Sequence, residues 1–149
     1  MKSMFNSRDA EEVIARINAL RPDSAANWGK MDVAQMLAHC QQPLRVATGE
    51  LKLKRGIFGF LFGKMAKKKL FGDQPWDKSL PTDKHFIIAD PRDFSTEKEK
   101  LIGLVSRFSV AGPAGVPTDP HPFFGKMTAE EWDRLTWNHL NHHLGQFGA

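Results

Sequence analysis

The chain has 149 residues, of which 41% are hydrophobic and 26% are charged, so we expect one globular domain spanning residues 1–149. No stretch has the roughly 20 apolar residues of a membrane span, and the N-terminus lacks the apolar region of a secretory signal. The single cysteine, Cys40, excludes an internal disulfide framework. These features predict a cytoplasmic protein without a membrane span, and a membrane is not the partner we expect.

The net charge of +4 comes from one segment of the chain. Residues 52–69 contain seven basic residues and no acidic one, which leaves the remainder slightly acidic. Because the excess of positive charge is confined to this segment, we do not expect a nucleic-acid partner.

The first two helices are predicted by apolar residues that recur at helical spacing. In the first, Asn6 or Ser7 can cap the start and Pro22 ends the segment. In the second, we expect Asp32 to cap the start, and Pro43 to kink or shorten the helix. The apolar faces contain Val13, Ile14, Ile17 and Leu20 in the first helix and Val33, Met36, Leu37, Cys40 and Leu44 in the second.

The connection from about 49 to 93 is a long insert between the second and third helices. Its segment 55–72 is both basic and aromatic, with Phe58, Leu61, Phe62 and Met65 able to share one helical face. Three interpretations remain open: a helix on the bundle or at a dimer contact, a lid whose lysines attract an anionic substrate, or an interfacial membrane helix. The run 85–89 is the only short strand candidate, and no partner strand is evident.

The third and fourth helices are also amphipathic. The third is predicted to begin near Ser95 or Thr96, and the fourth begins with a capping box formed by Thr128 and Glu131. Together the patterns predict an all-α protein, a four-helix bundle with a long connection between helices 2 and 3. The predicted core positions are Leu101, Leu104, Val105 and Phe108 in the third helix and Ala129, Trp132, Thr136, Leu140 and Phe147 in the fourth.

Histidines on the second and fourth helices form a candidate site. On a helical wheel, His139 and His143 lie beside Trp132 on the core side, His142 lies at the margin, and Asn138 and Asn141 face outward. Two imidazoles at i and i+4 can bind one divalent metal ion, or they can be core histidines held by hydrogen bonds.

The third ligand must come from another helix. His39 lies on the shoulder of the second helix's apolar face, from which it can reach a neighbouring helix. A boundary histidine bonded to solvent or backbone is an equally good interpretation of this residue. His85 and His121 lie in predicted loops and are weaker candidates.

These motifs resemble the DinB/YfiT-like superfamily. The resemblance rests on L-A-H-C around His39 and on H-x-x-x-H followed by G-Q at His139 and His143. The motifs N-W-G-K-M (27–31) and H-P-F-F-G-K-M-T-A-E-E-W (121–132) are similar to an uncharacterised branch of it, over about 27 to 147 with a poorly matched middle. Many relatives have H-R-G-Q where this chain has Leu144, which puts in doubt any polar contact of that arginine.

The resemblance implies a four-helix bundle with a divalent metal held by His39, His139 and His143. The metal would be zinc, nickel or iron. Its implied chemistry is that of a thiol-dependent transferase or a hydrolase acting on a small molecule, with a low-molecular-weight thiol as a candidate partner. His142 and His121 are the weak candidates for a catalytic role. The alternative is a non-catalytic helical protein, with structural histidines, that binds a partner or forms a dimer. We expect a homodimer whether or not the protein is an enzyme.

Overall fold

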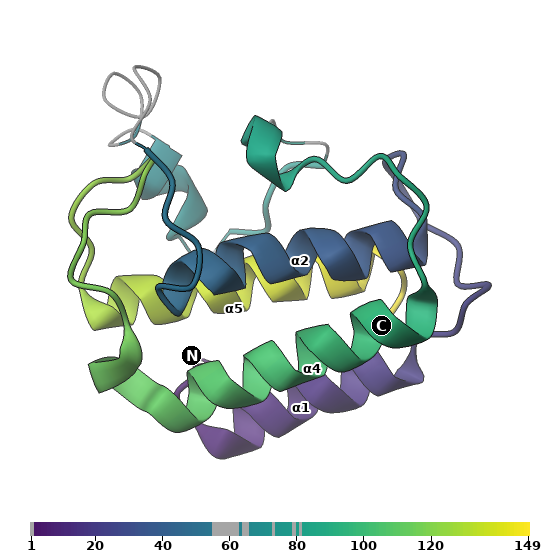
Figure 1. Ribbon diagram of the computed structural model, residues 1–149, viewed down its shortest axis with the longest axis horizontal. Helices are drawn as coiled ribbons and strands as arrows, with labels where there is room; N and C mark the ends of the chain where they lie inside the picture. The colour runs from purple at the N-terminus through teal and green to yellow at the C-terminus, as the bar shows by residue number, and fades with distance from the viewer. Residues whose placement is uncertain (1, 55–62, 64–65, 73, 79, 81) are drawn as a thin grey trace.

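The computed structural model describes residues 2–54, 63, 66–72, 74–78, 80 and 82–149. Within these ranges four long helices lie side by side (Figure 1): α1 (Ser7–Ala19), α2 (Val33–Ala47), α4 (Phe94–Ala111) and α5 (Ala129–Gln146). Both α1 and α2 pack against α4 and α5. Among the described residues no strand occurs, only an isolated bridge between His121 and Gly125. The prediction of an all-α fold is confirmed.

The helices begin where short polar side chains can accept hydrogen bonds from the first free backbone N–H groups. Asn6 caps α1, Asp32 forms a capping box with Gln35 at α2, and the predicted box at α5 is present. The predicted start of the third helix is wrong: Asp93 caps α4, and its carboxylate accepts a hydrogen bond from the Thr96 N–H at 2.8 Å.

Helix α2 continues for one more turn beyond Pro43, so the expected shortening is wrong. Proline cannot donate the hydrogen bond that the His39 carbonyl would otherwise accept within the helix. The turn nevertheless forms because it buries Leu44, Val46 and Ala47 in the core. Burial of apolar surface therefore outweighs the loss of one backbone hydrogen bond at this position.

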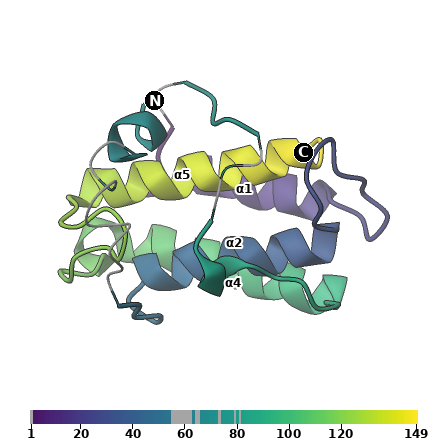
Figure 2. The same ribbon diagram turned by 90° about the horizontal axis from the view of Figure 1, so that it is seen from above.

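The four helices, seen from above in Figure 2, enclose one hydrophobic core to which all of them contribute buried residues. Nearly all of the predicted inward positions are buried, including Met36 and Leu37 on α2 and Trp132 and Leu140 on α5. Ile14 and Ala129 are only partly buried. None of the described helices is both long and apolar enough to cross a membrane.

The connection between α2 and α4 is tied down at several points. Residues 84–86 form the short 3₁₀ helix η1 (Lys84–Phe86), so the strand candidate at 85–89 is wrong. The Leu70 carbonyl accepts hydrogen bonds at 3.0 Å from the Trp76 indole and from Asn138 of α5. Asn138 is therefore half-buried under this segment instead of facing outward.

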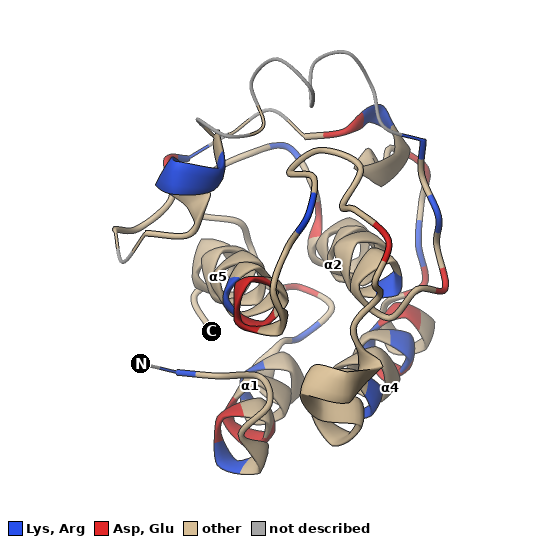
Figure 3. Cartoon of the chain, turned by 90° about the vertical axis from the view of Figure 1, so that its left-hand side faces the viewer, with Lys and Arg blue, Asp and Glu red and all other residues tan. Residues whose placement is uncertain are grey.

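The lysines at 67–69 lie in a short helical stretch, residues 66–70, which contacts α5 and is coloured blue beside it in Figure 3. Lys67 pairs with Glu131 at 2.7 Å, and Lys69 pairs with Asp77. These two ammonium groups thus bind carboxylates of the protein itself. The apolar face that was predicted for Phe58, Leu61, Phe62 and Met65 lies outside the described residues.

Candidate metal centre

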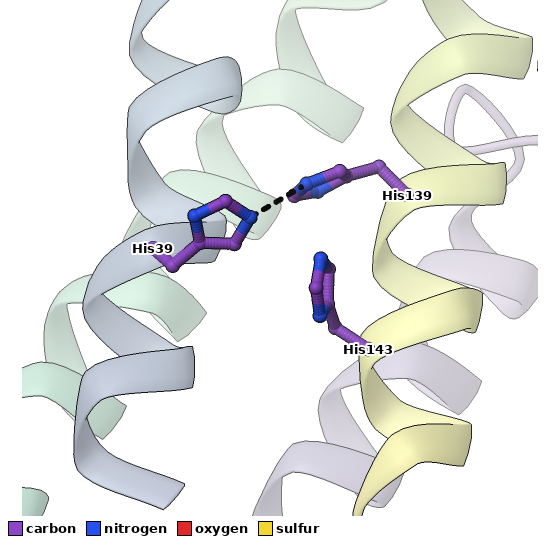
Figure 4. A group of neighbouring side chains, drawn as sticks. All are labelled: His39, His139 and His143. Atoms are coloured by element: carbon purple, nitrogen blue, oxygen red, sulfur yellow. Dashed lines mark hydrogen bonds between the residues drawn. The ribbon is translucent and has the colours of Figure 1, made fainter. Parts of the chain in front are cut away.

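His39 on α2 and His139 and His143 on α5 meet between the two helices (Figure 4). One ring nitrogen from each lies within 4.8 Å of the other two. His139 and His143 are one helical turn apart, so both rings leave α5 on the side that packs against α2. We call these three residues the histidine centre. The helical wheels predicted that His139 and His143 face inward, and the family resemblance implied that His39 joins them; the three side chains do converge.

The spacing of the nitrogens suits a single small ion. Two nitrogens that each bind one zinc ion at 2.0–2.1 Å in tetrahedral geometry lie about 3.3 Å apart. Nε2 of His139 lies 3.2 Å from Nε2 of His39. The ring of His143 lies 4.7 Å, centroid to centroid, from each of the other two rings. A closer approach of the His143 ring to the other two would give a three-nitrogen site of ordinary dimensions.

The orientation of His39 is set by the connection between α2 and α4. Its Nδ1 lies 2.8 Å from the carbonyl oxygen of Phe86 in η1. A carbonyl can only accept, so Nδ1 carries the proton and Nε2 presents a lone pair to the centre. Asp83 caps η1 by accepting a hydrogen bond from the His85 N–H at 2.8 Å, which fixes the position of the Phe86 carbonyl. Such outer partners align metal-binding imidazoles.

Gln146 performs the same task for His143. Its side-chain nitrogen donates to the Trp28 carbonyl at 2.6 Å, so its oxygen must face His143, whose Nδ1 lies 2.8 Å away. Nδ1 of His143 therefore carries the proton, and Nε2 faces the other two rings (Figure 4). Two of the three imidazoles are thus held in the tautomer that a metal requires.

Gly29 makes this contact possible. Its φ is +85°, and a Cβ at this position would lie 2.6 Å from the side-chain nitrogen of Gln146. Only glycine combines this backbone conformation with so close an approach. The N-W-G motif at residues 27–29 and the G-Q motif at residues 145–146 are therefore two halves of one support for His143.

His139 is arranged differently from the other two histidines. Because Nε2 of His39 holds a lone pair, Nε2 of His139 must donate the hydrogen bond that joins them. An ion would take the place of this proton. The ring of Trp76 packs against His139 with centroids 5.9 Å apart and covers it on the side of the 74–78 segment.

Burial keeps these imidazoles neutral. It lowers the pKa of His39, although the hydrogen bond to Phe86 opposes part of this effect. It lowers the pKa of His143 to about 3, with further help from the neighbouring imidazoles, and lowers that of His139 for the same two reasons. Neutral imidazole is the form that binds a metal, so the centre is ready for one at neutral pH.

The weaker candidates lie elsewhere or have other partners. His142 is half-buried beside the centre, with its ring 5.0 Å from that of His143. His121 is buried, and its Nδ1 accepts hydrogen bonds from the N–H groups of Phe123 and Phe124, so it fixes its own loop. His85 is exposed and pairs with Asp83 at 2.6 Å. Cys40 is buried, which raises the pKa of its thiol, and it behaves as a small hydrophobic residue.

Three partners of the centre were not predicted from the sequence: Phe86, Trp76 and Gln146. Only Gln146 had a signal, because it belongs to the G-Q motif that follows the paired histidines. Leu144, at the position where the DinB/YfiT resemblance led us to consider an arginine, is 1% exposed and lies in the hydrophobic core. No polar contact is made by this side chain.

The chain matches the model of a protein family. No curated protein and no solved structure matched the chain. The model of a family described as "Protein of unknown function (DUF1569)" matches residues 2–149, nearly the whole chain. The expectation of an uncharacterised family is thereby confirmed, and the chain belongs to the DUF1569 family of proteins of unknown function.

Proposed function

We propose that this protein is a divalent-metal-dependent enzyme that acts on a small molecule. The proposal rests on one observation: a nitrogen from each of His39, His139 and His143 lies within 4.8 Å of the other two. Zinc, nickel and iron are the metals that suit ligands of this kind. Three protein ligands leave a position open for water or substrate, which is typical of catalytic rather than structural sites.

The surrounding residues support a catalytic centre. The Phe86 carbonyl and the Gln146 side chain orient His39 and His143, and Trp76 shields His139 from water. When bound, the ion would supply Lewis acidity: it lowers the pKa of a bound water, polarises a carbonyl or holds a thiolate. The reaction we propose is of the thiol-dependent transferase or hydrolase type.

This proposal includes kinship with the DinB/YfiT-like superfamily as a four-helix bundle. It is supported by the helical fold and by the pairing of one histidine on α2 with two on α5. We further propose a cytoplasmic homodimer. The exposed side chain of Val110, 89% accessible, provides an apolar position for a subunit contact. Light scattering coupled to gel filtration measures the oligomeric state directly.

Metal content tests the central claim. Protein purified without an affinity tag or nickel resin is expected to contain close to one transition-metal ion per chain by mass spectrometry. His143→Ala should lose that ion and keep its helical circular dichroism, whereas the control change Glu99→Ala, at an exposed position on α4, should retain it. Substoichiometric metal, with no uptake of added zinc, nickel or iron, would refute the proposal.

The rival function is a non-catalytic protein that binds a partner through its helical surface. One observation favours it: the three histidines satisfy one another and their neighbours with hydrogen bonds, so burial alone does not demand an ion. The two functions differ in their response to metal. An added ion at 100 times its dissociation constant should stabilise an enzyme of the proposed kind by about 2.7 kcal/mol, and should leave the rival unchanged.

A further inference from the structure

A cavity of about 510 Å³ lies between α5 and the 74–78 segment, next to the histidine centre. This volume is within the range of pockets that bind small molecules. Many of the side chains that line the cavity are either aromatic or positively charged. These are Lys2, Trp28, Trp76, Lys78, Arg134 and Trp137.

The cavity and the histidine centre share a wall. His142 lines the cavity, and its ring lies 5.0 Å from that of His143. Trp76 also lines the cavity. The centroid of its ring lies 5.9 Å from that of His139 and 5.7 Å from that of His142. The three histidines of the centre do not line the cavity themselves, but His142 and Trp76 line it and contact them. The cavity therefore adjoins the histidine centre.

Flat, apolar surfaces face the cavity. Trp28, Trp76 and Trp137 are all partly buried, which leaves part of each indole accessible. The hydrogen bond from the Trp76 indole to the Leu70 carbonyl fixes that ring before any ligand arrives. Fixed indoles bind flat rings in offset or edge-to-face geometry, with little loss of side-chain entropy. This favours a ligand that contains a planar ring.

The charge of the cavity is positive. Lys2, Lys78 and Arg134 line it, and none of its described lining residues is acidic. Lys2 is already paired with Asp9 and Glu12. Nζ of Lys78 lies over the ring of Trp28, 4.9 Å from its centroid, so this ammonium sits directly beside an aromatic wall. A ligand that stacks on the indole and carries a negative group would meet that charge.

We infer that this cavity binds a small anion with a planar ring, and that such a molecule is the substrate of the histidine centre. The first part stands on the cavity alone. The second part rests on the proposed function, because only a bound ion would make the neighbouring centre reactive. The two parts therefore need separate measurements.

Binding can be measured by ¹⁹F NMR on metal-free protein with three probes. These are 4-(trifluoromethyl)benzoate, the neutral 4-(trifluoromethyl)benzyl alcohol and the ring-free anion trifluoroacetate. The benzoate should bind about tenfold more tightly than either of the others, since it alone combines ring and charge. If the alcohol or trifluoroacetate bound as tightly as the benzoate, the inference would be overturned.

Matched variants locate the bound probe. Lys78→Gln should weaken benzoate binding about threefold to fivefold, the effect of one partly exposed charge, and leave the alcohol unaffected. The control Lys54→Gln, at an exposed position outside the cavity, should change neither. Trp76→Leu should weaken both ring-containing probes, and circular dichroism checks that each variant is folded. An unchanged affinity in Lys78→Gln and Trp76→Leu would overturn the inference.

Loading with Co²⁺ tests the link to the centre. Paramagnetic Co²⁺ should broaden the bound benzoate signal, and diamagnetic Zn²⁺ should not. Normal benzoate binding in protein that takes up Co²⁺, without broadening, would overturn the assignment of the cavity as the substrate site. Protein that takes up no Co²⁺ would refute the proposed function, while the metal-free binding results would still decide the nature of the cavity ligand.

Discussion

Gln146 accepts a hydrogen bond from His143 at 2.8 Å while donating one to the Trp28 carbonyl at 2.6 Å. The amide can make both bonds in only one orientation, so it holds His143 in a single tautomer. Gln146→Leu, which preserves the size of the side chain, should therefore weaken zinc binding about 10-fold to 100-fold. Competition with a chromophoric chelator measures this. Gln42→Leu on α2 serves as the control, and equal affinities in the two variants would contradict this role for Gln146.

Gly29 and Gly49 form a natural pair for a second test. Both have positive φ, +85° and +74°, but a Cβ would clash with Gln146 only at Gly29 and would meet nothing within 4 Å at Gly49. Gly29→Ala and Gly49→Ala should each lose about 1–2 kcal/mol of unfolding free energy through backbone strain. Gly29→Ala alone should also weaken zinc binding, because it displaces the support of His143. Urea unfolding and metal titration of both variants separate the two effects.

We expect the stability of the protein to depend on pH because His121 is buried. Burial lowers its pKa to about 4 from an ordinary value of 6.5, so the unfolded chain binds this proton more readily than the folded chain does. The contribution of His121 to stability is complete above pH 6.5 and is lost as the pH falls through 4. Over that range the loss amounts to about 3 kcal/mol.

The variant His121→Gln isolates this effect, because the other histidines are the same in both proteins. Urea unfolding with a chelator present should show a large difference in stability between variant and wild type at pH 7. That difference should shrink as the pH falls to 4. A difference that stays constant with pH would mean that the proton on His121 does not affect folding.

Glu97 is a buried carboxylate, 5% exposed, that accepts a hydrogen bond from the Gln41 amide at 2.7 Å and pairs with Lys100 at 3.1 Å. Glu97→Ala removes the acceptor and should lower the free energy of unfolding by about 1–3 kcal/mol. Glu97→Gln keeps an acceptor and should lose less. Glu99→Ala, a change at an exposed neighbour, should stay within about 0.5 kcal/mol of wild type. If Glu97→Gln lost more unfolding free energy than Glu97→Ala, the buried hydrogen bond between Glu97 and Gln41 would not be what stabilises the fold here.

The helices and most of the core could be predicted because their signals are local. Apolar spacing and capping residues placed α1, α2 and α5, and the same spacing turned His139 and His143 toward α2. The start of α4 was misplaced because Ser95, Thr96 and Asp93 are all good capping residues. Which of them caps the helix depends on where the preceding loop enters.

The surroundings of the centre were not predictable in this way. Phe86 contributes a backbone carbonyl, which leaves no trace in side-chain patterns, and it reaches His39 from 47 residues away in the chain. Trp76 lies in a connection without periodicity, where nothing in the sequence specifies which helix it covers. The ligand candidates therefore followed from helical geometry, whereas their orienting partners depend on the path of the long connection.

His39 and His139 are separated by 100 positions in the chain. An ion held by both would cross-link the polypeptide and close a loop comprising about two thirds of it, which reduces the entropy of the unfolded ensemble. If the two chain ends were pulled apart mechanically, the force would act on α1, which lies outside the loop, and α1 would unfold before the cross-link breaks. The protein would then lengthen in two stages when metal is bound and in one when it is absent.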